Sequence, residues 1–196
     1  MSQHVARKAR ECPRLVCAAN LVEVKGHRYL IDALNLLRAN GLNATLDLCG
    51  DGPELHALVA QCDALGLNDI VSFKGRVPHQ QLLDALGNGE YDLFVLPSIQ
   101  ISASVHEGIP VSLLEAMGYG VPVVSTNTGS IGELLPASLG LTVPDRNPSA
   151  LAAAIREVLC DSSRYADLSK ALQRMVMDDW QISPMVDKLE KLIVGV

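Results

Sequence analysis

Two glutamates, Glu107 and Glu115, stand eight residues apart in the most informative segment of the sequence. The first lies next to Gly108 in a turn that also contains Pro110, and the second lies inside an apolar run. A second turn with glycine and proline then leads into a β-branched segment at 121–125. The pattern predicts a loop, a buried helix and a buried strand in succession. Because buried carboxylates need hydrogen-bond partners, we expect a polyhydroxylated ligand here.

The helix after Glu107 allows two interpretations of Glu115. If the helix begins near Pro110, its first N–H groups and its dipole favour an anion such as a pyrophosphate. Ser112 and Glu115 have the spacing of a capping box, in which Glu115 would only bind the backbone N–H of Ser112. A ligand contact is the alternative. Glu107, taken alone, also fits a solvated loop residue.

Other polar residues follow the predicted strands. Lys25 comes after the first strand and opens the first helix, where it could reach a phosphate as a point charge; a plain surface lysine is the alternative. The run Gly50-Asp51-Gly52 resembles half of a dinucleotide fingerprint, but Leu55 stands where the third glycine belongs. A tight turn into a helix explains it. His106 is most simply a loop histidine.

The elements that must position these residues alternate between strand and helix. The expected strands are 14–19, 45–49, 70–73, 91–96, 121–125 and 139–143. The expected helices are 26–40, 53–65, 80–86, one from Pro110, 131–135, 148–159 and the helical C-terminal segment from 163, with a last helix at 185–193. The alternation indicates an α/β, Rossmann-like parallel sheet of about six strands with helices on both faces. Ligands of such sheets bind at the carboxyl ends of the strands, where the strand order reverses.

Size and composition limit the classes of protein. The 196 residues suit one substantial domain, 14–196, after a tail or linker remnant at 1–13. A formal charge of −6 argues against a nucleic-acid-binding surface. The five cysteines form no C-x-x-C pair, and no apolar run approaches the length of a membrane span. We therefore expect a cytoplasmic protein with reduced thiols.

The order of these signals resembles the C-terminal, donor-binding domain of GT-B glycosyltransferases, in particular the retaining family 4 ("glycosyl transferases group 1"). The resemblance covers residues 14–195, and a serine-rich stretch before Glu107 resembles enzymes of exopolysaccharide or colanic-acid synthesis. It rests on the following segments: Ala18-Ala19-Asn20-Leu21-Val22-Glu23-Val24-Lys25-Gly26, Leu48-Cys49-Gly50-Asp51-Gly52-Pro53-Glu54-Leu55, Val71-Ser72-Phe73-Lys74-Gly75-Arg76-Val77, Leu93-Phe94-Val95-Leu96-Pro97-Ser98, the E-x7-E signature from Glu107 to Glu115, Gly120-Val121-Pro122-Val123-Val124-Ser125-Thr126, and Ser130-Ile131-Gly132-Glu133-Leu134.

The resemblance implies a nucleotide-diphosphate sugar, with a UDP- or GDP-sugar as donor. Glu107 would bind hydroxyls of the donor hexose, and Glu115 would accept hydrogen bonds from the ribose. Lys25 would neutralise the diphosphate leaving group, where charge accumulates. The backbone near the first glutamate would hold the sugar and the distal phosphate (Gly108, Ile109 and Val111), and the segment Gly75, Arg76 and Val77 would bracket the base. The family needs no metal and no cofactor.

Two departures from the family matter. Asn20 stands where the family has an arginine beside Lys25, so the diphosphate would lose a cation that Arg76 could replace. The acceptor-binding N-terminal domain is expected to be missing from this chain, and peripheral membrane association through that domain is left open. The chain would then bind donor without transferring sugar by itself. The alternatives are a non-catalytic nucleotide-sugar-binding module, and a GT-B-fold epimerase or phosphorylase.

Overall fold

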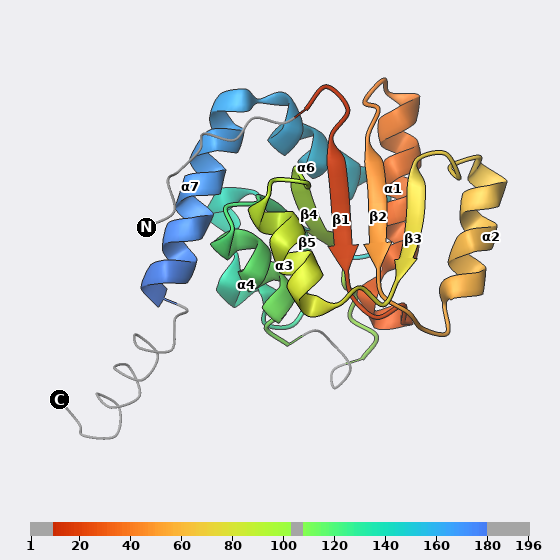
Figure 1. The fold of residues 1–196 in the computed structure, drawn as a ribbon, viewed down its shortest axis with the longest axis horizontal. Helices are drawn as coiled ribbons and strands as arrows, with labels where there is room; N and C mark the ends of the chain where they lie inside the picture. Colours follow the sequence, from red (N-terminus) through yellow and green to blue (C-terminus); the bar gives the residue numbers. More distant parts are fainter. Residues whose placement is uncertain (1–9, 103–107, 180–196) are drawn as a thin grey trace.

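Six parallel strands form one sheet in the order β3-β2-β1-β4-β5-β6 (Figure 1). The computed structural model describes residues 10–102 and 108–179. The strands are β1 (Arg14–Ala18), β2 (Thr45–Cys49), β3 (Val71–Gly75), β4 (Leu93–Leu96), β5 (Val123–Thr126) and β6 (Thr142–Val143). The order reverses between β1 and β4, as in Rossmann-type sheets. The predicted fold class is therefore confirmed.

The helices cover both faces of this sheet. They are α1 (His27–Ala39), α2 (Leu55–Leu65), α3 (His79–Gly87), α4 (Val111–Gly118), α5 (Ile131–Leu134), α6 (Pro148–Cys160) and α7 (Ser162–Asp179), with short 3₁₀ helices η1 (Glu23–Lys25) and η2 (Ala137–Leu139). On one face α1 packs against α2 and α6, and on the other face α4 packs against α3 and α7 (Figure 1). The reversal of strand order produces this division, because right-handed crossovers in opposite directions place their helices on opposite faces.

The central strands are buried on both faces, which explains their continuous apolar sequence. All four residues of β4 are buried, and Val16 and Cys17 of β1 have no exposed surface. β3 lies at the edge and instead alternates, with Val71 buried and Lys74 exposed. Aliphatic side chains fill most of the core, in agreement with the low aromatic content of the chain.

The predicted boundaries agree with most elements and fail in identifiable places. β2 spans the predicted residues, and α6 begins at Pro148 after Asn147, whose Oδ1 accepts a hydrogen bond from Ala150 N at 3.0 Å. The last strand is shorter than expected, because Leu139 belongs to the 3₁₀ helix η2 that ends at Gly140 in the left-handed conformation. The predicted helix at 185–193 lies outside the described residues.

The buried Asp47 of β2 interacts with polar side chains before β4 and on β1 and β3. Asp47 Oδ2 accepts a hydrogen bond from the Tyr91 hydroxyl at 3.0 Å, and Arg14 Nη2 lies 3.3 Å from the same oxygen. Lys74 Nζ lies 3.4 Å from Asp47 Oδ1. Burial, together with the nearby Asp47 carboxylate that accepts its hydrogen bond, raises the pKa of Tyr91, so its hydroxyl is a donor at neutral pH. A carboxylate with three partners is a tolerable buried charge.

We expect Asp47→Ala to lower the free energy of unfolding by about 1–3 kcal/mol, because it leaves the buried Tyr91 hydroxyl without its acceptor. Denaturant unfolding followed by circular dichroism measures the change. The matched control is Asp69→Ala, which removes a 73% exposed carboxylate 3.6 Å from Arg38 and should change stability by less than about 0.5 kcal/mol. Equal losses in the two variants would contradict the interpretation.

Candidate functional site

The loops that follow β1 and β4 touch where the strand order reverses. Ile99 N donates to Val24 O at 2.8 Å, which joins the two loops directly. Gly26 has φ +66°, and a Cβ atom there would lie 2.0 Å from the carbonyl oxygen of Pro97. Only glycine fits a left-handed residue pressed against another backbone. This contact brings Lys25, the residue before Gly26, to the predicted edge of the sheet.

The loops after β1, β2 and β3 continue the same edge through backbone hydrogen bonds. Ala19 N donates to Cys49 O at 3.0 Å, and Gly50 N donates to Gly75 O at 2.8 Å. A Cβ atom on Gly50 would lie 2.0 Å from Ala19 O. Gly50 is therefore required by the close approach of two loops. This explains the half-fingerprint in the sequence as loop packing.

The predicted residues on these loops differ in their surroundings. Lys25 is half-buried in the 3₁₀ turn η1, whereas Asn20 is exposed at the end of β1. Arg76 is 87% exposed, and its Nε lies 3.6 Å from Asp51 Oδ2. Arg76 follows β3, which lies two strands away from β1 in the sheet. The idea that Arg76 replaces the arginine missing at Asn20 therefore gains no support from the order of the strands.

The segment that leads into α4 forms the helix start at which the sequence predicts an anion. Gly108 and Ile109 are exposed, and Pro110 is the N-cap of the helix with extended backbone. Leu113 N and Leu114 N donate to Pro110 O at 3.1 and 3.4 Å, so the amides of Val111 and Ser112 precede the first intrahelical bonds. Such leading amides favour an anion. Glu107 and His106 lie outside the described residues.

Glu115 binds a neighbouring helix, and the capping-box interpretation is wrong. α4 begins at Val111, one residue before Ser112, so Ser112 is a helical residue that cannot serve as the N-cap. Glu115 Oε1 instead lies 2.5 Å from His79 Nε2, the ring nitrogen of the first residue of α3. Sequence reasoning missed His79, because no local pattern reveals a contact between two helices.

Side chains of β5 and of the loop after β6 form hydrogen bonds with the end of β4 and with the loop that follows it. Ser125 Oγ donates to Leu96 O at 2.6 Å, and Thr126 Oγ1 donates to Ser98 O. Gln100 N donates to Asp145 Oδ2 at 3.0 Å. Arg146, which has φ +53°, donates from Nη2 to Gln100 O at 2.6 Å. The start of the serine-rich stretch, as far as Gln100, is thus held by β5 and by the loop after β6.

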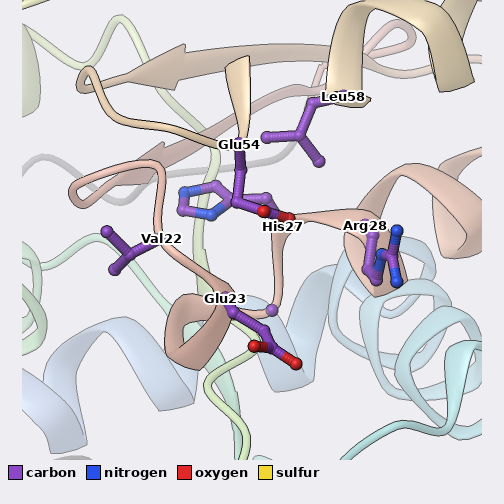
Figure 2. Close-up of a pocket in the computed structure, with 7 residues that line it drawn as sticks. Val22, Glu23, His27, Arg28, Glu54 and Leu58 are labelled. Atoms are coloured by element: carbon purple, nitrogen blue, oxygen red, sulfur yellow. The ribbon is translucent and has the colours of Figure 1, made fainter. Parts of the chain in front are cut away.

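A small pocket lies beside this edge, between η1 and the first turns of α1 and α2 (Figure 2). Its lining residues are Val22, Glu23, Gly26, His27, Arg28, Glu54 and Leu58. His27 is 2% exposed, and within the described residues neither of its ring nitrogens has a hydrogen-bond partner. Burial, reinforced by the positive charge of Lys25, lowers the pKa of His27 from its ordinary value of 6.5 to about 4. His27 is therefore neutral at pH 7.

Within 10–102 and 108–179, no three His, Cys, Asp or Glu side chains gather as metal ligands would. Across the same residues, no helix has the length and apolar character needed to cross a membrane. All five cysteines are free thiols.

The fold and the loop arrangement define a Rossmann-like domain of the type found in GT-B glycosyltransferases. Residues 3–175 match the family "Glycosyl transferases group 1", and the chain belongs to this family. The predicted resemblance is confirmed. WcaL of Salmonella typhimurium, a glycosyltransferase assigned to colanic acid biosynthesis, is 36% identical over 156 residues, which are 79% of this chain and 38% of WcaL.

Two further comparisons cover nearly the whole chain. The GDP-mannose-dependent alpha-(1-6)-phosphatidylinositol monomannoside mannosyltransferase of Mycolicibacterium smegmatis is 31% identical over 185 residues, 93% of this chain and 48% of that protein. The crystal structure of Anabaena HepE in complex with UDP superposes with a TM-score of 0.79 at 23% identity, over 95% of this chain and 50% of HepE. The chain thus spans about half of these relatives or less.

We expect Gly26→Ala to destabilise the protein by at least about 3 kcal/mol, because the added Cβ must displace the Pro97 backbone as well as adopt a left-handed conformation. Gly41→Ala is the matched control. Gly41 has φ +80° but no atom within 4 Å of the added Cβ, so the cost should be only about 1–2 kcal/mol. Thermal and denaturant unfolding measure both, and similar losses would show that the loop contact is loose.

The buried imidazole of His27 predicts acid sensitivity. The unfolded chain binds a proton near pH 6.5 that the folded chain resists until about pH 4, so the free energy of unfolding falls as the pH drops through this window, by about 3 kcal/mol in total. The free energy of unfolding, measured at several pH values between 4 and 7, should therefore change less with pH in His27→Leu than in the wild type. His56→Leu, at an exposed position of α2, should keep the wild-type slope. The same pH dependence of the free energy of unfolding in the wild type and in His27→Leu would contradict the prediction.

Proposed function

We propose that this chain is the donor-binding part of a retaining glycosyltransferase that uses a nucleotide-diphosphate sugar, UDP- or GDP-linked, and transfers the sugar to a glycan or lipid-linked acceptor. One observation carries the proposal. In a chain that belongs to the group 1 family, the Lys25 loop, the leading amides of α4 and Glu115 follow strands whose carboxyl ends share one edge of the sheet.

Each group at this edge suits one part of such a donor. Lys25 would neutralise the diphosphate as it leaves, and the amides of Val111 and Ser112 would bind phosphate or sugar oxygens. Glu115 would accept hydrogen bonds from the ribose hydroxyls, and the segment 75–77 would bracket the base. Glu107, which the structure does not describe, remains the predicted contact for the hexose hydroxyls.

Several parts of the proposal rest on the relatives. The mycobacterial relative is named for GDP-mannose and HepE was crystallised with UDP, which supports a nucleotide-sugar donor with one of these two bases. We propose that the sugar is transferred with retention of configuration and without a metal or cofactor, as the family resemblance implies. We also propose that a separate acceptor-binding domain completes the active site, that any approach to a membrane occurs through that domain, and that the reaction takes place in the cytoplasm.

A second candidate is a module that binds nucleotide sugar without transferring it. The observation that favours it is Asn20, which is exposed where the family has an arginine. A single lysine would then face the diphosphate, and loss of one charge-assisted contact costs about 1.5–3 kcal/mol. Such a module would bind donor with normal stoichiometry while supporting no turnover.

Calorimetric titration of the chain with UDP, GDP, UDP-glucose and GDP-mannose tests the donor site. We expect Lys25→Ala and Glu115→Ala each to weaken binding by about 1.5–3 kcal/mol, roughly 10- to 150-fold in Kd. Lys170→Ala on α7 and Glu90→Ala, which precedes β4 at the opposite edge of the sheet, are matched controls that should bind as the wild type does.

Two results would decide against the proposal. Absence of binding to every nucleotide would exclude a donor site in this chain, and equal binding by the site and control variants would exclude Lys25 and Glu115. Transfer needs the complete protein, in which NMR of the product gives the anomeric configuration. A product with the anomeric configuration of the donor supports retention, and a product with the inverted configuration contradicts it. Donor binding without any product supports the non-catalytic binding module.

A further inference from the structure

The Glu115 carboxylate is held from outside its own helix. His79 Nε2 lies 2.5 Å from Glu115 Oε1, and the two side chains are 66% and 21% exposed. We infer that His79 is a positioning residue, which orients the Glu115 carboxylate toward the two ribose hydroxyls of the nucleotide. This inference rests on the proposed function and names the residue on which recognition of the ribose depends.

The contact leaves the carboxylate able to bind a ligand. The hydrogen bond with His79 uses one acceptor site of Oε1, so Oε2 and the second lone pair of Oε1 can accept from the two ribose hydroxyls. A glutamate side chain loses substantial rotamer freedom when it is ordered. Because the hydrogen bond with His79 restricts Glu115 before the nucleotide arrives, less of that entropy is lost on binding. Glu115 has no capping role that would orient it from within α4.

The two helices are also in contact at their far ends, which places α3 alongside α4. A Cβ atom on Gly87, the last residue of α3, would lie 3.2 Å from the ring of Tyr119, the C-cap of α4. At the near end Pro78 is the N-cap of α3, so the helix starts at the histidine. His79 therefore reaches Glu115 from a helix that packs along α4.

The place of His79 in the chain connects it to the nucleoside. It follows the segment 75–77, which the proposed function assigns to the base, with only Pro78 between them. One short stretch would thus bracket the base and orient the acid for the sugar attached to it. A carboxylate that accepts from two adjacent hydroxyls discriminates against a nucleotide that lacks one of them, because the unpaired acceptor is then left partly desolvated.

Calorimetry with UDP, GDP and their 2′-deoxy counterparts tests the inference on the whole chain. The ratio of deoxy to ribo Kd is the readout. We expect His79→Ala to reduce this ratio by about 3–10-fold, through weaker binding of the ribonucleotides. His79→Gln should restore the ratio, because its amide Nε2 has the reach of the imidazole Nε2, whereas the shorter His79→Asn should not. His56→Ala, at an exposed position of α2, is the control and should keep the wild-type ratio.

Glu115→Ala separates failure of this inference from failure of the proposed function. One outcome is that Glu115→Ala lowers the ratio of deoxy to ribo Kd while His79→Ala and His79→Asn leave it at the wild-type value. Glu115 would then recognise the ribose without His79, which overturns the inference and leaves the proposed function intact. If Glu115→Ala keeps the ratio, or no nucleotide binds, the proposed role of Glu115 fails and the inference fails with it. A reduced ratio in His79→Gln as well would place the imidazole itself against the nucleoside and overturn a positioning role.

Discussion

The structure depends on the contact between the turn after β1 and the loop after β4, the two strands where the order of the sheet reverses. Gly26 lies so close to the Pro97 carbonyl that any side chain would separate the loops. The same glycine is the N-cap of α1 and follows Lys25 directly. This backbone contact therefore fixes where the chain carries Lys25 at the carboxyl ends of the strands.

The remaining polar groups are arranged around this point by backbone geometry. The edge beyond β1 is built from amide-to-carbonyl bonds between successive loops, and the edge beyond β4 is built from hydroxyl-to-carbonyl bonds that involve Ser125 and Thr126. Leading backbone amides and lysines are the groups that proteins commonly use to bind phosphates, and the proposed function assigns the amides of Val111 and Ser112 and the side chain of Lys25 to that role. The net negative charge of the chain is therefore compatible with an anion site.

Much of the fold could be predicted, since apolar runs and Gly/Pro turns are local signals that buried parallel strands require. The edge on which the loops gather followed from the alternation of strand and helix alone. The sequence predictions failed where a contact depends on tertiary packing, or where one local pattern fits two structures. The spacing of Ser112 and Glu115 fits a cap as well as a helix interior, and Pro110 decides between them by starting the helix earlier. The His79 contact and the burial of His27 depend on packing between helices that no local pattern encodes.

The two outermost strands of the sheet, β3 and β6, have a consequence for association with other molecules. An edge strand offers unpaired N–H and C=O groups to any other strand, and proteins prevent such pairing with short edges and charged residues. β6 has only two residues, and β3 carries the exposed Lys74, which Asp47 holds against the sheet. The ion pair between Lys74 and Asp47 therefore also keeps a charge on the outermost strand β3, which disfavours pairing with a strand of another molecule and aggregation.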